Sequence, residues 1–164
     1  MKKYSKIKIY TCGGTFEKVY DPISGELTFK NSSIKEMLKI SRITVPTNVE
    51  ELMLIDSLDM NKKHREKISK KVAADENNHI ILIHGTDTMV ESAKEINVHK
   101  RDQQIVILTG AMIPFAIKKS DALFNFGCAI TGLNYVSPGV YIAMNGKIFE
   151  YAKVSKNKKM GIFE

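Results

Sequence analysis

The chain has 164 residues, 43% of them hydrophobic, with 25 basic and 18 acidic side chains and a formal net charge of +7 at pH 7. This size and composition fit a single domain over residues 1–164, and no run approaches the roughly 20 apolar residues of a membrane span. The opening residues, MKKYSKIKIY, lack the apolar core of a signal peptide, so we expect a cytoplasmic protein.

Five short apolar runs predict β-strands. They are residues 7–11 (IKIYT), 49–55 (VEELMLI), 80–84 (IILIH), 105–109 (IVILT) and 140–144 (VYIAM). The third and fourth runs are almost continuously apolar and rich in isoleucine, as expected of parallel strands that are covered on both faces.

The segment 17–35, directly after the first strand, interrupts this pattern. Asp21-Pro22 and Ser24-Gly25 are turn dipeptides, and residues 26–29 alternate enough to form one strand of a hairpin. A long excursion at this place suits a flexible lid over a substrate, and a hairpin without such a role fits the pattern equally well.

Helical spacing of apolar residues predicts helices over 61–74, 88–98 and 121–133, with Ser120 and Asp121 as N-terminal caps of the last one. Strands and helices therefore alternate along the chain. The predicted fold class is α/β with three layers, a mostly parallel sheet with helices on both faces.

Four of the strands are followed by loops that carry hydroxyl or carboxylate groups. The loops are residues 12–16 (CGGTF), 56–61 (DSLDMN), 84–89 (HGTDTM) and 109–114 (TGAMIP). In open α/β sheets, ligands bind outside the carboxyl ends of the strands. We therefore expect a site rich in threonine, serine and aspartate at this edge of the sheet.

The loop CGGTF allows several interpretations. It lacks the lysine of a phosphate-binding loop and the G-x-G-x-x-G pattern of a dinucleotide site. Cys12 would need a nearby histidine or helix N-terminus to act as a nucleophile, and at the end of a buried strand it is more often a small apolar filler. Gly13 and Gly14 permit a sharp turn that exposes the Thr15 hydroxyl, although such a turn often has no further role.

The loop HGTDTM places the Thr86 hydroxyl and the Asp87 carboxylate directly before a predicted helix, where Asp87 could simply cap that helix. A threonine attacks a substrate only if a base removes its proton. A lysine with a depressed pKa is a plausible base, but the sequence does not select one. His84 is a second candidate, although a histidine at a strand end more often has a packing role.

The positive charge raises the question of a nucleic-acid partner, because lysines crowd residues 1–8, 62–71 and 147–159. These lysines are interleaved with acidic residues, arginines are few, and no series of aromatic side chains runs between them. We therefore expect an ordinary solvated surface and no nucleic-acid partner.

Taken together, the four loops resemble the bacterial-type L-asparaginase family, whose signatures are TGGT, GSQDMN, HGTDTM and GAMRP. HGTDTM is an unbroken match, residues 120–130 (SDALFNFGCAI) are similar to the family segment S-A-D-G-x-x-N-L-x-x-A, and the likeness spans essentially the whole chain. The resemblance implies a flavodoxin-like or Rossmann-like fold that hydrolyses the side-chain amide of L-asparagine, sometimes L-glutamine. It implies a threonine nucleophile and an acyl-enzyme, and no metal or cofactor. A glutaminase, another amidohydrolase and a non-catalytic amino-acid-binding module of the same fold are the alternatives.

The resemblance also implies catalytic roles for individual residues. Thr15 is similar to the nucleophile of the family, and Tyr20 is the best candidate for its lid tyrosine. Thr86 and Asp87 correspond to a second cluster. A loose alignment of the C-terminal segment adds Lys156 to this cluster and leaves Lys153 and Lys158 as alternatives.

Substrate contacts follow from the same resemblance. Ser57 and Asp87 match positions that hold the α-carboxylate and α-amino groups of the substrate, and Leu58 replaces a glutamine that contacts it. Backbone N–H groups near Thr15 and Ala111 would stabilise the oxyanion, and Gly14 and Ala111 are expected among the substrate-binding residues. Longer members carry a C-terminal domain that completes the site of a neighbouring subunit. We expect this chain to be a single catalytic domain without that second domain, and a homo-oligomer.

Overall fold

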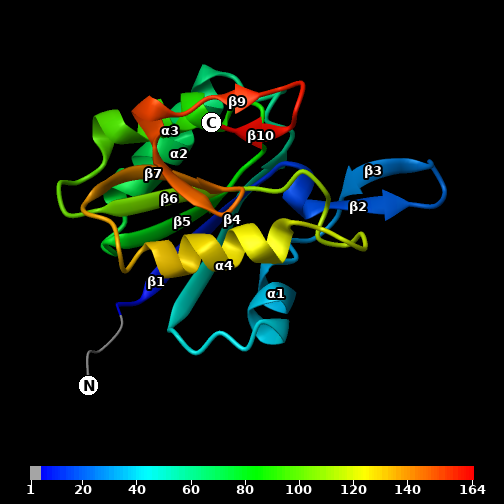
Figure 1. The fold of residues 1–164 in the computed structure, drawn as a ribbon, viewed down its shortest axis with the longest axis horizontal. Helices are drawn as coiled ribbons and strands as arrows, with labels where there is room; N and C mark the ends of the chain where they lie inside the picture. The colour runs from blue at the N-terminus through cyan, green and yellow to red at the C-terminus, as the bar shows by residue number, and fades with distance from the viewer. Residues whose placement is uncertain (1–4) are drawn as a thin grey trace.

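The structure, a computed structural model, describes residues 5–164 and is built around a six-stranded sheet in the order β4-β1-β5-β6-β7-β8 (Figure 1). All strands but β8 run parallel. Their bounds are Ile7–Gly13 for β1, Thr47–Ile55 for β4, His79–Ile83 for β5, Ile105–Thr109 for β6, Gly139–Met144 for β7 and Lys147–Glu150 for β8. The five predicted strands are confirmed, and their spatial order is the flavodoxin-like arrangement.

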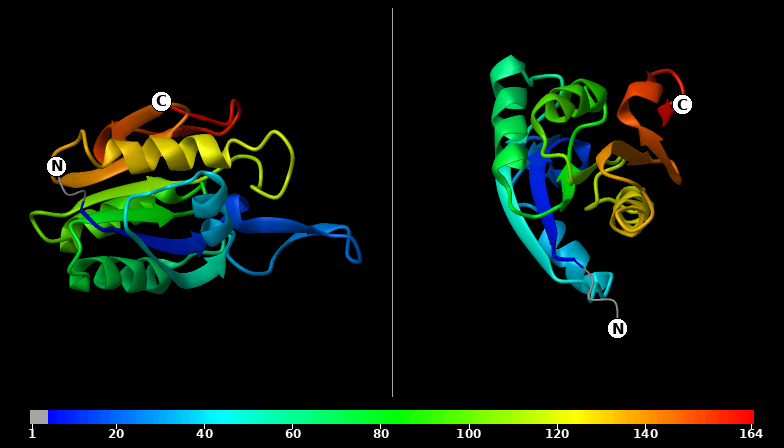
Figure 2. Two further views of the ribbon diagram at one scale, coloured as in Figure 1. Left: turned by 90° about the horizontal axis from the view of Figure 1, so that it is seen from below. Right: turned by 90° about the vertical axis from the view of Figure 1, so that its left-hand side faces the viewer.

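Helices cover both faces of the sheet, as the sequence predicts (Figure 2). Helices α2 (Lys62–Ala74) and α3 (Met89–His99) pack on one face, and α1 (Ile34–Ile40) and α4 (Ala122–Gly132) on the other. Each face of the sheet has its own hydrophobic core. Side chains alternate along β5, so Ile80 and Leu82 pack in the core under α2 and α3, while Ile81 and Ile83 pack in the core under α1 and α4. None of the helices in residues 5–164 is long and apolar enough to cross a membrane.

The excursion after β1 is a two-stranded hairpin, as predicted. It begins with a 3₁₀ turn, η1 (Thr15–Glu17), and continues as β2 (Lys18–Asp21) and β3 (Glu26–Phe29), which pair with each other and not with the main sheet. Figure 1 shows the hairpin projecting from the body of the molecule.

Several short elements escape prediction from the sequence. They are α1, β8, the 3₁₀ turn η2 (Tyr151–Lys153), and a small antiparallel pair, β9 (Lys156–Asn157) with β10 (Ile162–Phe163). Each spans too few residues to show a helical or strand period. The pair β9–β10 folds the C-terminal segment back on itself, and Ser155 and Glu164 exchange two backbone hydrogen bonds at its base (2.8 and 3.0 Å).

The start of α2 supplies a test of the fold. The Asn61 side chain accepts the His64 N–H, and the His64 ring accepts the Asn61 N–H (both 3.2 Å), which together form a capping box. We expect Asn61→Ala to lower the free energy of unfolding by about 1 kcal/mol, because an N–H of the first turn loses its partner. Urea unfolding measures this change. The control Asn31→Ala, at an exposed position, should change stability by less than about 0.5 kcal/mol, and an equal loss in both variants would contradict the assignment.

Candidate active site

The carboxyl ends of β1 and β5 mark the topological switch point of the sheet. From β1 the chain continues to β4 on one side, and from β5 it continues to β6 on the other side. The loops that follow such a pair of strands diverge, and open α/β sheets bind ligands there. Thr15 follows β1 after Gly14, and Thr86 follows β5 after Gly85.

Three of these loops approach one another closely at two glycines. Gly14 has a φ of 74°, and a Cβ atom there would lie only 2.3 Å from the Cα of Gly85. A Cβ atom at Gly85 would in turn lie 2.6 Å from the Oγ of Ser57. Glycine alone permits the positive φ together with this approach. The Gly14 N–H donates to the Ile55 carbonyl oxygen (2.9 Å), so Gly14 contributes close packing and its N–H is already engaged.

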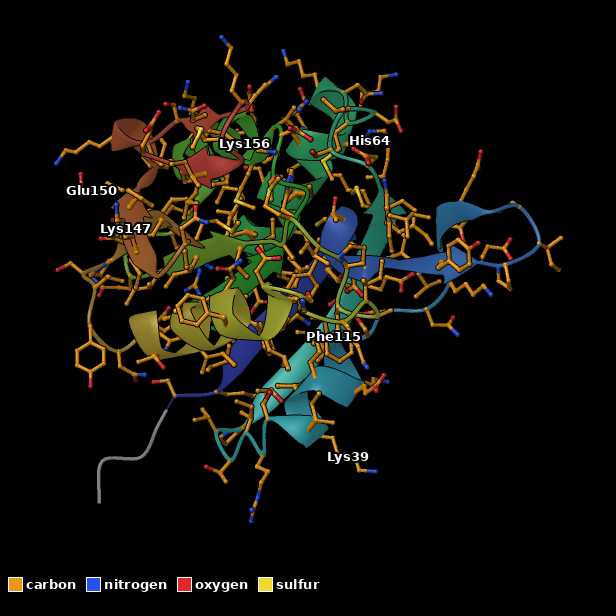
Figure 3. The ribbon with its side chains drawn as sticks, turned by 45° about the vertical axis from the view of Figure 1, so that its right-hand side comes forward. Lys39, His64, Phe115, Lys147, Glu150 and Lys156 are labelled. Atoms are coloured by element: carbon orange, nitrogen blue, oxygen red, sulfur yellow. The ribbon has the colours of Figure 1, made fainter. Side chains whose placement is uncertain are left out.

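Thr86, Asp87 and Lys156 lie together in one cluster. The Nζ of Lys156 donates to Oγ1 of Thr86 at 2.7 Å and pairs with Oδ1 of Asp87 at 2.8 Å. Thr86 is buried, and the Lys156 side chain is only 8% exposed. Figure 3 shows Lys156 on β9, so the cluster joins the loop after β5 to a strand that lies 70 residues further along the chain.

Among the three lysines that the sequence leaves open, the structure brings Lys156 to the cluster. Lys153 forms an ion pair with Glu150 on the surface, where its side chain is 73% exposed, and Lys158 is exposed as well. Lys156 is held in place because its strand is hydrogen-bonded to β10, whose Phe163 is buried in the core.

The loop after β6 completes the surroundings of Thr86. The Thr86 hydroxyl donates to the Met112 sulfur at 3.7 Å, and the neighbouring Ala111 is buried. Asp121 stands at the N-cap position of α4, but its carboxylate accepts the N–H groups of Met112 and Ile113 (3.0 Å each) and makes no capping bond to its own helix. Asp121 therefore fixes this loop by pairing two of its backbone N–H groups, and it also accepts the side-chain N–H of Asn125 on α4 at 2.9 Å.

Ser57 presents a buried hydroxyl that lacks a partner. The residue is 1% exposed, and its Oγ makes no hydrogen bond within the described part of the chain, whereas its carbonyl oxygen accepts the Thr88 hydroxyl at 2.7 Å. A buried hydroxyl without a partner costs free energy, so its place is typical of a group that binds a ligand. Leu58, predicted to contact substrate, turns outward and is 66% exposed.

The remaining predicted residues lie on the segment that leads into the hairpin. Thr15 opens η1 and is partly buried, one residue beyond the contact between Gly14 and Gly85. Tyr20 pairs with Leu27 across the hairpin and is 59% exposed. Within residues 5–164, no hydrogen bond joins Tyr20 to the Thr86 cluster.

His84 has a structural position behind the cluster. Its Nδ1 lies 2.8 Å from the Gly85 carbonyl oxygen and its Nε2 lies 2.8 Å from the Ser92 hydroxyl, so both ring nitrogens are engaged. Complete burial lowers the pKa of His84 to about 4, a shift that the hydrogen bond to Gly85 opposes and the Arg65 charge reinforces. His84 is therefore neutral and holds the loop in place, in agreement with the packing interpretation.

Cys12 is fully buried at the end of β1, and burial raises the pKa of its thiol, so little reactive thiolate forms. This supports its interpretation as an apolar filler. In the part of the chain that the structure describes, no group of three histidine, cysteine or acidic side chains is arranged to hold a metal ion.

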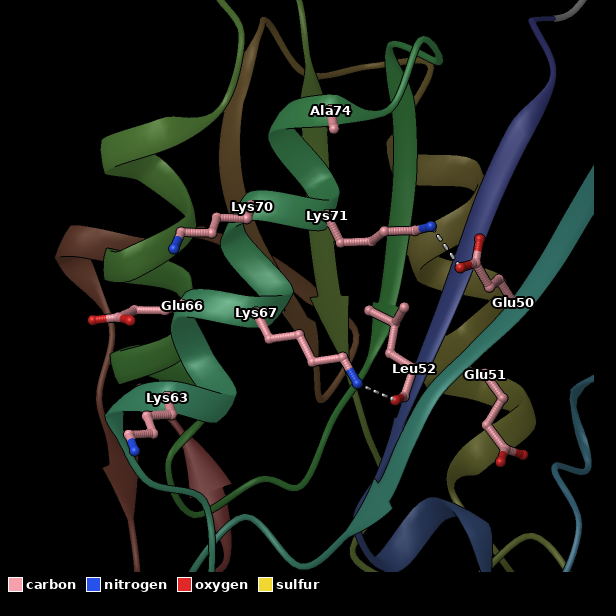
Figure 4. A pocket seen from close by; sticks show the side chains of 9 residues that line it. All are labelled: Glu50, Glu51, Leu52, Lys63, Glu66, Lys67, Lys70, Lys71 and Ala74. Atoms are coloured by element: carbon pink, nitrogen blue, oxygen red, sulfur yellow. Dashed lines mark hydrogen bonds and ion pairs between the residues drawn. The ribbon is translucent and has the colours of Figure 1, made fainter.

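A groove of about 620 Å³ lies elsewhere, between α2 and β4 (Figure 4). Both lysine and glutamate side chains line the groove. Lys71 forms an ion pair with Glu50 at 2.7 Å, and the Lys67 amine donates a hydrogen bond to the Leu52 carbonyl oxygen at 3.3 Å. The charges of the groove are largely compensated, and it shares no residue with the four loops, so the groove is separate from the candidate site at the switch point.

Comparisons with known proteins identify the family to which the chain is similar. Residues 6–162 match a family model described as "Asparaginase, N-terminal". The L-asparaginase of Thermococcus kodakarensis is 27% identical over 161 residues, which cover 96% of this chain and 49% of that protein. L-asparaginase 1 of Escherichia coli K12 is 30% identical over 167 residues, covering 95% and 48%. A glutaminase-asparaginase of Pseudomonas fluorescens is 26% identical and covers 94% and 46%.

The fold is shared with solved structures as well. The solved structure of the thermostable L-asparaginase from Thermococcus kodakarensis superposes with a TM-score of 0.84 at 28% identity, over 97% of this chain and 50% of that one. The chain thus spans about half the length of the relatives that it matches.

Gly14 and Gly25 form a matched pair for testing the contact between the loops. Both have a φ of 74°, but a Cβ atom at Gly25 would meet nothing within 4 Å. We expect Gly25→Ala to cost about 1–2 kcal/mol of unfolding free energy from backbone strain alone, and Gly14→Ala to cost clearly more, because its methyl group would collide with Gly85. Thermal and urea unfolding of both variants measure the difference. Equal losses would mean that the two loops do not touch.

The buried His84 predicts a pH dependence of stability. Between pH 6.5 and pH 4 the unfolded chain binds a proton at His84 that the folded chain does not, so the free energy of unfolding falls as the pH drops, by up to about 3 kcal/mol. His84→Gln should remove this part of the slope, as measured by urea unfolding at a series of pH values. If the free energy of unfolding changed with pH in the same way in the unmodified chain and in His84→Gln, the result would contradict a buried neutral histidine.

Proposed function

The chain belongs to the asparaginase family, and on this premise we propose that it hydrolyses the side-chain amide of L-asparagine to L-aspartate and ammonia. The contact of Lys156 with Thr86 and Asp87 carries the proposal. An amine, a hydroxyl and a carboxylate within hydrogen-bonding distance, in a mostly buried position, suit proton transfer to and from a threonine. A binding site for an amino acid has no need of such a cluster.

In the proposed reaction, Thr15 is the nucleophile. Its Oγ1 attacks the amide carbon, the C–N bond breaks, the nitrogen leaves as ammonia after gaining a proton, and the acyl group remains on Thr15. Water then attacks the acyl carbon, and L-aspartate leaves as the proton returns to Thr15. The contact between Gly14 and Gly85 supports this scheme, because it places Thr15 and Thr86 on adjoining loops.

Lys156 and Asp87 have separate tasks in this scheme. Lys156 accepts the proton that Thr86 relays from the attacking group, directly or through water, and Asp87 holds the Lys156 amine in place. The N–H groups of Thr15 and Ala111 are the proposed donors to the developing oxyanion, since the N–H of Gly14 is engaged by Ile55.

Substrate binding is proposed for the polar groups that surround this cluster. The unpartnered Ser57 hydroxyl would bind the α-carboxylate, and the Asp87 carboxylate, whose side chain is 32% exposed, would bind the α-ammonium group. Leu58 offers no polar group to the substrate. Tyr20 could approach it only if the hairpin closed over the site, as lids commonly do.

Two alternatives remain open for measurement. L-glutamine differs from L-asparagine by one methylene group, and a relative named glutaminase-asparaginase favours testing it as a second substrate. A non-catalytic amino-acid-binding module would bind L-asparagine and release no ammonia.

Ammonia release from L-asparagine and L-glutamine tests the proposal. We expect the unmodified chain to be active and Thr15→Val, Thr86→Val and Lys156→Met each to lower kcat by at least about 100-fold, because each removes a group that transfers a proton or attacks the amide. The matched controls are Thr44→Val and Lys158→Met, at exposed positions, and they should retain activity.

An unmodified chain that releases no ammonia from either amide would refute the hydrolase. Calorimetric binding of L-asparagine by that inactive chain would instead indicate the binding module. Full activity in Lys156→Met would refute the role of the cluster.

A further inference from the structure

Glu17 is a buried carboxylate directly after the candidate nucleophile loop. The residue is 2% exposed, and its two oxygens accept four hydrogen bonds. The donors are the Thr11 hydroxyl (2.6 Å), the Ser32 hydroxyl (2.8 Å), and the N–H (2.8 Å) and hydroxyl (2.9 Å) of Ser33. Burying a carboxylate is costly unless hydrogen bonds replace its water, and these four donors do so.

The four donors come from both sides of the hairpin. Thr11 lies on β1, before the hairpin, whereas Ser32 and Ser33 lie between β3 and α1, after it. Glu17 therefore closes the base of the β2–β3 hairpin and attaches it to the main sheet.

Lys18 makes a second connection, to the loop that follows β4. Its Nζ pairs with Oδ2 of Asp56 at 2.5 Å, and the two side chains are only 20% and 27% exposed. Burial raises the pKa of Asp56, but the hydrogen bonds from Lys18 and from the Leu58 N–H outweigh this, so the pKa lies below its ordinary value. Asp56 directly precedes Ser57, and it stands where the family signature GSQDMN has glycine.

The backbone carries both connections to Thr15. The Glu17 N–H donates to the Gly14 carbonyl oxygen (3.1 Å), and the Lys18 N–H donates to the Thr15 carbonyl oxygen. Fixing the side chains of residues 17 and 18 therefore fixes the turn that presents the Thr15 hydroxyl.

We propose that Glu17 and Lys18 form a brace that sets the position of the Thr15 hydroxyl relative to the Ser57 hydroxyl. Both are positioning residues, and this inference rests on the proposed amide hydrolysis. Glu17 orients the attacking group, and Lys18 orients the loop that holds the α-carboxylate of the substrate. Displacing a reacting group by about 1 Å can cost 100-fold in rate, so the brace has a measurable effect on catalysis.

The two halves of the brace predict different kinetic defects. We expect Glu17→Ala to lower kcat for L-asparagine by about 100-fold with little change in KM, because Thr15 is misplaced. Lys18→Met should raise KM by about tenfold with a smaller effect on kcat, because the Ser57 loop loses its support. Ser32→Ala, which removes one donor and leaves Glu17 buried, should lower kcat less than Glu17→Ala and serves if that variant does not fold.

A conservative variant separates geometry from charge. Glu17→Gln keeps an acceptor for the Ser33 groups, and its NH₂ can donate to the hydroxyls of Thr11 and Ser32, which accept as readily as they donate. We expect it to recover kcat to within about tenfold of the unmodified chain. Glu26→Ala and Lys30→Met, at exposed positions of the hairpin segment, are the matched controls and should leave both constants unchanged.

Hydrogen exchange supplies a readout that needs no activity. Amide groups of residues 14–18 should exchange faster in Glu17→Ala, and those of residues 56–58 faster in Lys18→Met, while the controls match the unmodified chain. Faster exchange with unchanged kcat and KM would overturn the positioning roles and leave a purely structural anchor. An inactive unmodified chain would refute the proposed function, and unchanged exchange would refute the brace.

Discussion

The contact between the backbones at Gly14 and Gly85 is the constraint on which the site depends. Two parallel strands that lie side by side in a sheet would ordinarily send side chains into the space beyond their ends. Here the residue at the closest point of each loop is a glycine without a Cβ atom, so the loops after β1 and β5 touch and then turn apart. Thr15 and Thr86 are consequently presented from a rigid support, and Ser57 joins them through its contact with Gly85.

The rest of the fold serves to hold this contact in place. Apolar side chains that alternate along β5 tie the strand to helices on both faces of the sheet. Polar groups secure the loops individually, since Asp121 binds the loop after β6, His84 the loop after β5, and Glu17 the turn after β1. Each of these three is a buried or partly buried polar group, and its hydrogen-bond partners are uncharged, so the arrangement depends on geometry more than on charge.

The sequence predicts the sheet and the long helices because their apolar patterns are long enough to recognise. The strands show runs of several apolar residues, and the helices show apolar residues at helical spacing over several turns. Thr86 and Asp87 are predictable from one unbroken motif, whereas Lys156 requires a family resemblance, since nothing local distinguishes it from Lys153 or Lys158. Asp121 occupies the predicted N-cap position, but its carboxylate binds N–H groups at the start of the same β6–α4 connection and not the N–H groups of the helix. Glu17 is not predictable at all, because an acidic residue in a turn normally indicates solvent, and its four donors meet only in three dimensions.

The origin of Lys156 on β9 has a consequence for the order of events during synthesis. The six-stranded sheet and helices α1 to α4 are complete by β8, so a nascent chain that has emerged to that point can already bury most of both cores, which Val154 and Phe163 complete later. The contact between Lys156 and Thr86 closes a loop of 70 residues and must follow. A ribosome-bound chain can therefore form its sheet before the amine of Lys156 reaches the hydroxyl of Thr86.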